Sequence, residues 1–265
     1  MRIDKYLALH GFAKSRETAQ KLLEDGAVTV GGRRVKPSFD IDESSPPEIE
    51  IIGELPRYVS RGGLKLERAL EAFNIDVVGL DAVDIGASSG GFTDCLLQHG
   101  ARRVRAVDVG HSQLDPTLAS DPRVVSYEGI NARGLVPEQI GGQCDIAVCD
   151  VSFISLTLIL PAVTRILKPD GRFVGLIKPQ FEAGRQNIGK GGIVKSREVH
   201  AEVIERVLAA AGALGLGCVG VISSPIEGGD GNREYLASFV YGRERTVDTK
   251  AISAAVHGQK TVCGQ

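Results

Sequence analysis

Apolar and polar positions follow two different periods along most of the chain. Between residues 81 and 241, short apolar runs alternate with longer stretches that are apolar on one helical face. The runs predict strands and the stretches predict helices. Predicted strands are 82–85, 103–107, 124–127, 145–149, 172–177, 218–222 and 235–240, and predicted helices are 64–73, 92–99, 155–167 and 197–212. This alternation predicts an α/β domain with a mostly parallel, seven-stranded sheet between two helical layers.

The first 52 residues have a shorter pattern of their own. Helical spacing predicts one helix at 2–10 and a second at 16–25, each ended by a glycine. A hairpin is predicted for 27–36, turning at Gly31 and Gly32, and 49–52 adds another strand. These elements predict a small α+β module in front of the larger domain.

The distribution of charged residues adds a prediction for the small module only. The chain of 265 residues is 43% apolar with a net charge of −2, so its totals indicate no nucleic-acid partner. Residues 1–36, however, hold eight lysines and arginines against four acids, whereas 37–55 hold six acids and no base. Such a local basic block predicts contacts with phosphates. The alternative is a charged subdomain that is simply solvated.

Cysteine usage and the first residues exclude several classes. The five cysteines are an odd number without C-x-x-C spacing, which indicates buried thiols and neither a disulfide framework nor a metal site. Charges at Arg2, Asp4 and Lys5 interrupt any signal peptide, and no apolar run is long enough to span a bilayer. We therefore expect a cytoplasmic protein that does not bind membranes.

One glycine-rich stretch points to a ligand. Residues 81–97 read DAVDIGASSGGFTDCLL, a strand, a glycine turn and a helix start, as in nucleotide-binding α/β units. The spacing is not the G-x-G-x-x-G of dinucleotide enzymes. Asp84, just before Gly86, suits a ligand with an amine better than a pyrophosphate, so an aminoacyl nucleoside such as S-adenosylmethionine fits. The alternative is a structural glycine turn.

Charged residues also stand at the ends of predicted strands. Asp108, Asp150 and Lys178 follow strands, Glu234 precedes one, and Lys65 lies in the helix before the first strand. We expect the strand-end residues to share the edge that carries the glycine turn. A lysine at the end of a buried strand is costly unless it is paired or used. Burial and a second lysine favour the neutral amine, which can take a proton from a hydroxyl. The alternative is two ion pairs that hold strand ends.

The small module resembles the S4 RNA-binding domain. The match covers residues 1 to about 50 and rests on R-x-D-x-x-L, S-R and G-x-V-x-V-x-G within RIDKYLALHGFAKSRETAQKLLEDGAVTVGGRRVK. The resemblance implies that basic residues of this module and of the segment after it hold RNA phosphates: Arg2, Lys5, Lys14, Arg16, Lys21, Arg33, Arg34, Arg57 and Arg61.

The larger domain resembles a family of RNA-modifying enzymes. Lys65, Asp150, Lys178 and Glu234 look like the Lys-Asp-Lys-Glu tetrad of the 2′-O-ribose methyltransferases related to the heat-shock 23S rRNA methyltransferase. With the S4-like module, YVSRGGLKL, the glycine turn, KPQFEAGR and KGGIV, the chain resembles the TlyA family over residues 1 to about 241. Members are rRNA 2′-O-methyltransferases with an FtsJ-like domain, and some are labelled haemolysins. The resemblance implies a Rossmann-like class I methyltransferase that uses S-adenosylmethionine.

The resemblance also implies roles for individual residues. Lys178 would remove the proton of a ribose 2′-hydroxyl, Asp150 and Lys65 would orient it, and Glu234 would complete the network. The methyl group would pass directly to the oxygen, with no metal. Asp84 would anchor the methionine amine of the cofactor, and Asp108 would take its ribose hydroxyls. The remaining cofactor contacts would be Gly86, Ala87, Ser88, Gly90, Gly91, Phe92, Val109, Asn131 and Asp150.

The expected layout is an S4 domain at 1–55, a linker at 56–63, an FtsJ-like methyltransferase domain at 64–242 and a loose tail at 243–265. The family's linker often carries Arg-x-Trp-Val, whereas this chain has RYVS and no Trp, so no coupling role is carried over to that segment. The loop 180–195 is expected to cover the substrate and to become ordered on RNA. The expected substrate is ribosomal RNA within ribosomal subunits, with cytidine in 16S or 23S rRNA, or both, as the target.

Two other functions stay open. A membrane-active haemolysin would agree with the label of some family members, but no secretion signal, spanning segment or basic amphipathic surface helix is present. A non-catalytic RNA-binding protein would retain a vestigial domain. The intact glycine turn and all four tetrad positions disfavour that second alternative.

Overall fold

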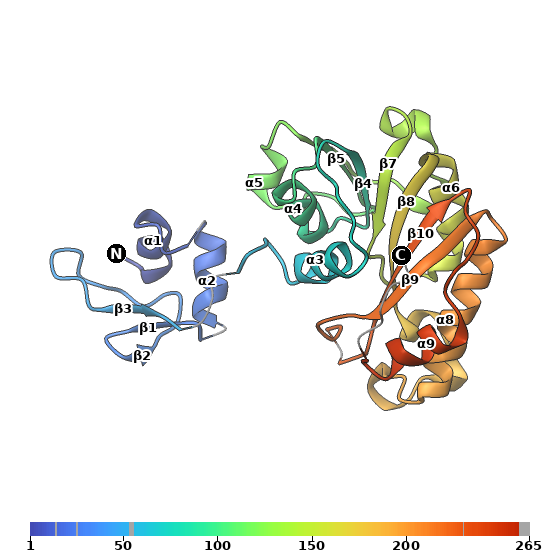
Figure 1. Cartoon of the computed structure of the whole chain (residues 1–265). Helices are drawn as coiled ribbons and strands as arrows, with labels where there is room; N and C mark the ends of the chain where they lie inside the picture. The colour runs from blue at the N-terminus through green and yellow to red at the C-terminus, as the bar shows by residue number, and fades with distance from the viewer. Residues whose placement is uncertain (14, 25, 53–55, 230, 260–265) are drawn as a thin grey trace. The chain divides into compact units, whose positions relative to one another are not determined.

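Two compact units make up the chain, residues 1–59 and 60–265 (Figure 1). The computed structural model describes residues 1–13, 15–24, 26–52, 56–229 and 231–259, with the backbone but not the side chain of Lys21. The division falls inside the segment that the sequence predicts to be a linker. No helix in these ranges has both the length and the apolar character needed to cross a bilayer.

The amino-terminal unit, residues 1–59, is the predicted α+β module. Its helices are α1 (Ile3–Leu9) and α2 (Arg16–Glu24), and its antiparallel sheet has the order β2-β1-β3, with β1 (Val28–Val30), β2 (Arg33–Arg34) and β3 (Ile49–Ile51). Gly31 and Gly32 have φ values of 57° and 72°, which a two-residue hairpin turn requires. The apolar faces of both helices pack with β1 around Ile3, Leu7, Ala19, Leu22 and Val28.

A seven-stranded sheet forms the centre of the carboxy-terminal unit, residues 60–265. The strands are β4 (Asp81–Ile85), β5 (Arg103–Val107), β6 (Val124–Tyr127), β7 (Cys144–Cys149), β8 (Leu167–Ile177), β9 (Leu216–Ser223) and β10 (Tyr235–Tyr241), in the order β6-β5-β4-β7-β8-β10-β9. Only β10 runs antiparallel to its neighbours, which are β8 and β9. The predicted mostly parallel sheet is therefore confirmed.

Helices cover both faces of this sheet (Figure 1). They are α3 (Gly62–Ala72), α4 (Gly91–Gln98), α5 (Pro116–Ala119), α6 (Leu160–Ile166), α7 (Pro179–Glu182), α8 (Arg197–Gly212) and α9 (Thr249–Val256). Helices α3 and α4 pack on each other, whereas α6, α8 and α9 share one apolar core with the central strands. Stacked rings of Phe173 and Phe239, 5.5 Å between centroids, lie in that core.

The chain end differs from the expected loose tail. Residues 249–256 form α9, which buries Ile252, Ala255 and Val256 against β9 and α8. The Asp248 carboxylate caps the helix by accepting from the Ala251 amide at 2.8 Å. Three buried positions in eight residues are too few to produce a clear period in the sequence. Residues 260–265 lie outside the described residues.

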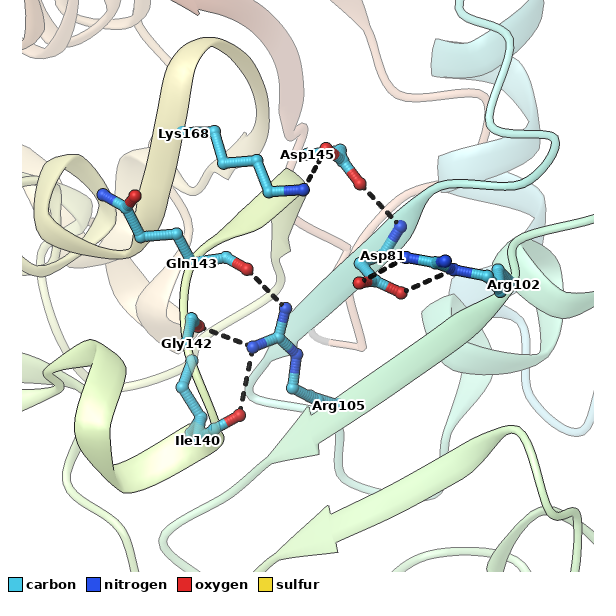
Figure 2. Close-up of polar contacts among 8 residues, drawn as sticks. All are labelled: Asp81, Arg102, Arg105, Ile140, Gly142, Gln143, Asp145 and Lys168. Atoms are coloured by element: carbon cyan, nitrogen blue, oxygen red, sulfur yellow. Dashed lines mark hydrogen bonds and ion pairs between the residues drawn. The ribbon is translucent and has the colours of Figure 1, made fainter.

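Polar contacts join the starting ends of several strands, an arrangement we call the amino-edge network (Figure 2). Asp145 of β7 accepts from Lys168 Nζ at 2.7 Å and from the Asp81 backbone amide at 2.9 Å. Asp81 in turn accepts both Nε and Nη2 of Arg102, at 3.2 and 2.8 Å. These bonds tie together the first residues of β4, β7 and β8.

Arg105 of β5 completes the amino-edge network (Figure 2). Its side chain is buried and donates to the backbone carbonyls of Ile140 at 3.0 Å, Gly142 at 2.6 Å and Gln143 at 2.9 Å. A buried carbonyl without a donor is unfavourable. Arg105 therefore stabilises the turn that leads into β7.

Candidate active site

Four charged side chains gather at the opposite edge of the sheet, where β7 and β8 end. Asp150 follows β7 directly and Lys178 follows β8 directly. Glu234 precedes β10, and because β10 pairs antiparallel with β8, with Tyr235 opposite Ile177, its start lies beside the end of β8. Lys65 comes from α3, which contacts β10. We call Lys65, Asp150, Lys178 and Glu234 the tetrad.

The tetrad forms a chain of alternating charges. Lys178 Nζ lies 2.6 Å from Asp150 Oδ1, and Lys65 Nζ lies 2.6 Å from Glu234 Oε2 and 3.9 Å from Asp150 Oδ2. The side chains of both lysines are 10% exposed and that of Glu234 is 3% exposed. Asp150 is more open, at 21%, so two lysines and two carboxylates alternate in a mostly buried site, with Lys65 between the carboxylates.

Two further polar side chains contact the tetrad. Lys178 Nζ donates to Ser152 Oγ at 2.8 Å, and Gln180 Nε2 donates to Glu234 Oε1 at 3.3 Å. Both lie two residues after a tetrad member, but the sequence pattern does not select them. The direction of a side chain after a strand depends on backbone angles that its period does not encode.

An exposed aromatic ring, that of Phe153, contacts Phe181, whose own ring centre lies 5.9 Å from Lys178 Nζ. The Phe153 ring is 92% exposed, its backbone has a φ of 64°, and its centroid lies 5.2 Å from that of Phe181. A left-handed conformation is unfavourable for a bulky residue by about 1–3 kcal/mol, and such outliers cluster at functional sites. A side chain that neither buries its ring nor relaxes its backbone is a candidate for ligand contact. The hydrophobic pattern of the sequence does not indicate this position.

The glycines of the turn between β4 and α4 are explained by neighbouring protein atoms. A Cβ at Gly86, whose φ is 81°, would lie 2.9 Å from the Asp150 carbonyl oxygen. A Cβ at Gly91 would lie 3.0 Å from the Gly63 amide nitrogen, and one at Gly90 would overlap the Leu118 side chain. The glycines thus let the turn approach the end of β7, and α4 approach α3 and α5. They do not by themselves require a ligand.

Asp84, at the base of that turn, is the feature that favours a ligand. Its carboxylate is fully buried, and Thr93 Oγ1 donates to Oδ2 at 2.7 Å. Among the described residues Oδ1 has no hydrogen-bond partner. Burial, together with the nearby Asp150 and Asp108 charges, raises the pKa of Asp84 to about 7, although hydrogen bonds from Thr93 oppose the rise. A buried acceptor without a donor fits a ligand that brings an amine.

Asp108 connects the glycine turn to the loop after β5. Its carboxylate accepts from the amides of Ser88 at 2.8 Å and Gly110 at 2.7 Å. Each carboxylate oxygen can accept a second bond, so ribose hydroxyls remain compatible with this position. A small cleft here is lined by Ala87, Ser88, Ala106, Asp108, Gly110, Gln113, Leu114, Ser126 and Glu128. Val109, beside it, is 70% exposed.

Two predicted cofactor contacts have other roles in the structure. Asn131 is exposed, accepts from the Arg133 amide at 3.1 Å and caps a short 3₁₀ helix, and it is not among the residues that line the cleft. Phe92 is buried in the first turn of α4. Glu128, directly after β6, lines the cleft instead and accepts from the Ser112 amide at 2.9 Å. The strand-end rule that selected Asp108 would also have selected Glu128.

The predicted RNA-contact residues of the amino-terminal unit surround a buried acid. Asp4 is fully buried and accepts from Arg2 at 3.2 and 2.8 Å, from Arg16 at 3.1 Å and from Gln20 at 2.7 Å. Burial raises its pKa, but the hydrogen bonds of Gln20, Arg2 and Arg16 lower the pKa of Asp4 to about 2. Both arginines keep outward N–H groups, since their side chains are 44% and 50% exposed.

The other described residues among the predicted RNA contacts are exposed. They are Lys5, Arg33, Arg34 and Arg57 of the amino-terminal unit and Arg61 at the start of the carboxy-terminal unit. Lys14 and the side chain of Lys21 lie outside the described residues.

Metal ligands and reactive thiols do not gather in the part of the chain that the structure describes. No group of three or more His, Cys, Asp or Glu side chains there could hold a metal ion. The four described cysteines, Cys95, Cys144, Cys149 and Cys218, are free and buried. Burial raises the pKa of Cys144 to about 12, so this thiol stays protonated and unreactive.

Comparisons with known proteins divide the chain at the same place. Residues 58–241 match the model of FtsJ-like methyltransferases, and residues 1–45 match that of the S4 domain. The 16S/23S rRNA (cytidine-2′-O)-methyltransferase TlyA of Mycobacterium tuberculosis is 43% identical over 258 residues, which cover 97% of this chain and 96% of that protein. Hemolysin A of Brachyspira hyodysenteriae is 42% identical over 242 residues, covering 91% of this chain and 100% of that protein.

A solved structure is also similar over nearly the whole chain. It is a hemolysin-named protein of Streptococcus thermophilus, with a TM-score of 0.77, 45% identity, and coverage of 97% of this chain and 94% of that one.

Proposed function

Because the chain belongs to the FtsJ-like methyltransferase family and carries an S4 domain in front of that domain, we propose that it methylates a ribose 2′-oxygen of ribosomal RNA. Its cofactor is S-adenosylmethionine, which supplies the methyl group as an electrophile. The unpartnered Asp84 oxygen fits the amine of that cofactor, and Asp108 fits its ribose hydroxyls. The single observation that carries the proposal is the mostly buried tetrad of two lysines and two carboxylates at the ends of β7 and β8.

Lys178 is the base of the proposed reaction. In its neutral form the amine accepts the proton of the 2′-hydroxyl while that oxygen takes the methyl group. Asp150, 2.6 Å away, keeps the amine near the end of β8 and stabilises the ammonium that forms. Lys65, between Asp150 and Glu234, offsets both carboxylates, so that the negative charge near Lys178 is limited. Alignment of the two reactants can supply about 7–11 kcal/mol of the barrier.

Phe153 supplies a stacking surface for the target base. Its exposed ring, two residues before Ser155 and three after Asp150, offers an apolar face that a nucleobase can cover. Stacking of one base on an aromatic side chain contributes about 1–3 kcal/mol. A nucleotide held there brings its ribose close to Lys178, because the neighbouring Phe181 ring lies 5.9 Å from Nζ.

The amino-terminal unit holds the RNA backbone. The carboxylate of Asp4 fixes Arg2 and Arg16 side by side, and their remaining N–H groups can pair with phosphate oxygens. Lys5, Arg33 and Arg34 extend this basic surface, and the basic loop 180–195 covers the bound nucleotide. Following the relative from Mycobacterium tuberculosis, we assign cytidine of 16S or 23S rRNA in cytoplasmic ribosomal subunits as the target.

Transfer of tritium from labelled S-adenosylmethionine to purified ribosomal subunits tests the proposal. We expect label in rRNA that resists base removal, because the methyl group lies on the ribose. Mapping of 2′-O-methyl positions in rRNA from cells with and without the gene identifies the nucleotide. Absence of any gene-dependent 2′-O-methyl position contradicts the proposal, and lysis of lipid vesicles by the purified protein would favour a haemolysin instead.

A further inference from the structure

The contacts of Lys178 with its two polar neighbours differ in kind. Nζ forms an ion pair with Asp150 Oδ1 at 2.6 Å, but Oδ1 has no hydrogen-bond partner among the described residues. Ser152 Oγ, in contrast, accepts a hydrogen bond from Nζ at 2.8 Å. Among the described residues, Ser152 is the only hydrogen-bond acceptor of this amine. Charge attraction has no preferred direction, whereas a hydrogen bond orients the N–H group that donates it.

We propose that Ser152 is a positioning residue that orients the Lys178 amine toward the ribose hydroxyl. This inference rests on the proposed role of Lys178 as the base. A neutral amine carries two N–H groups and one lone pair, and rotation about the Cε–Nζ bond decides where the lone pair points. With one N–H held on Ser152 Oγ and Asp150 on another side, the lone pair is confined to the remaining direction.

Neighbouring backbone holds the Ser152 hydroxyl in place. The amide of Asp150 donates to the Ile85 carbonyl at 3.1 Å, which ties the start of this turn to β4. On its other side Phe153 has a φ of 64°, in the left-handed region that a bulky residue rarely adopts. The acceptor therefore belongs to a defined turn, although the Ser152 residue itself is exposed. The Phe181 ring competes little with Ser152 for the Lys178 amine, because its centre lies 5.9 Å from Nζ, near the outer limit of a cation–π contact.

Because Ser152 is exposed, a positioning role can be distinguished from a structural role by experiment. Replacement of an exposed serine usually changes the free energy of unfolding by less than about 0.5 kcal/mol. Loss of a hydrogen bond that orients the reacting group, in contrast, lowers a rate by roughly 10- to 100-fold. A kinetic defect without a stability defect is thus the expected signature.

Two substitutions of nearly equal shape isolate the hydroxyl. Ser152→Thr keeps it, and Ser152→Val has almost the same volume without it. We expect Ser152→Val to lower kcat for methyl transfer roughly 10- to 100-fold while the KM values for cofactor and rRNA stay within about twofold. Ser152→Thr should retain kcat within about threefold of the wild type. Equal rates of the two variants, whether both high or both low, would overturn the inference.

A second readout needs no substrate. In protein labelled with ¹⁵N and ¹³C in lysine, we expect the Lys178 Nζ–H signal to persist in the wild type and in Ser152→Thr, and to be lost to solvent exchange in Ser152→Val. Lys168, 43% exposed, is the internal control that should not change, and Lys178→Met assigns the signal. An unchanged Lys178 signal in Ser152→Val overturns the positioning role. If the wild type does not methylate rRNA, the proposed function fails, whereas this comparison still decides whether Ser152 orients the amine.

Discussion

Strands β7 and β8 carry an aspartate–lysine pair at each end, and the two pairs differ in their surroundings. Asp145 and Lys168 meet at 2.7 Å at the starting end, and Asp150 and Lys178 meet at 2.6 Å where the strands finish. The distances are nearly equal, but Lys168 is 43% exposed and Lys178 is 10% exposed. Distance within an ion pair therefore does not distinguish a structural pair from a candidate catalytic one. The exposed fraction of each lysine and the other residues around each pair are what differ.

The remaining neighbours differ in a consistent way. In the amino-edge network the contacts reach backbone atoms: Asp145 accepts the Asp81 amide, and Arg105 donates to three carbonyls (Figure 2). In the tetrad they reach other side chains, since Lys65 lies between Asp150 and Glu234. Bonds to backbone hold strands in register, whereas side-chain contacts can rearrange when a substrate arrives.

Substitution of the two lysines, one at a time, should give the largest difference between the two pairs. Lys178→Ala should lower methyl transfer about 10²- to 10⁴-fold, because the proton of the hydroxyl then has no acceptor. Lys168→Ala removes the same charge from the same strand and should leave transfer within about twofold. Tritium transfer measures both, with calorimetry confirming that each variant still binds cofactor. Equal losses in the two variants would mean that the tetrad is only structural.

The pH dependence of stability should have opposite signs at the two edges. Burial raises the folded-state pKa of Asp84, at the carboxyl edge, to about 7 from an ordinary 3.8. Its contribution to stability is fully present below about pH 4 and is lost as pH rises through about 7, an effect of about 4 kcal/mol. Partial burial raises the pKa of Asp145, but its hydrogen bonds with Lys168 and the Asp81 amide lower it overall. That contribution is present above pH 4 and falls as the solution becomes more acidic.

Asn substitutions at both positions, compared by urea unfolding from pH 3 to pH 8, check these signs. Asp84→Asn should remove the loss of stability between pH 4 and pH 7, and Asp145→Asn should remove part of the loss in acid. A wild-type stability that rises between pH 5 and pH 8, with no difference in Asp84→Asn, would contradict the role of burial.

Loss of the Arg105 side chain should affect stability without affecting chemistry. Arg105→Leu leaves three carbonyls without their donor and should lower the free energy of unfolding by about 2 kcal/mol. Methyl transfer per folded molecule should not change, because Arg105 belongs to the amino-edge network. Urea unfolding measures the loss of stability. The tritium assay is run about 20 °C below the thermal unfolding midpoint of the variant, so that it measures methyl transfer by folded protein. A transfer defect in the folded variant would show that the two edges are coupled.

Lys168→Ala should have the smallest effect. Its ion pair with Asp145 is partly exposed, and such pairs contribute less than about 1 kcal/mol to the free energy of unfolding. The same urea experiment in 0.1 M and 1 M salt checks this, since screening should remove most of the difference. A cost as large as that of Arg105→Leu would mean that the bond between Asp145 and the Asp81 amide depends on Lys168.

Much of the candidate site could be predicted because its residues occupy strand ends. Asp150 and Lys178 follow uninterrupted apolar runs, and parallel strands place their carboxyl ends at one edge. Glu234 precedes its strand, and the antiparallel pairing of β10 brings it to that same edge. Asn131 stays a prediction, and the structure shows only that its side chain caps the turn that follows, as an Asn after a strand often does.

The amino-acid sequence by itself determined the alternation of strands and helices, the separate basic module and the strand-end positions of the tetrad, because burial and side-chain period are encoded locally. Only the tertiary structure decided that Ser152 bonds to Lys178, that Phe153 stays exposed, that the turn glycines face protein neighbours and that α9 packs on β9. Each of these depends on the direction of a side chain or backbone after an element ends, and that direction is set by whichever distant segment packs against it.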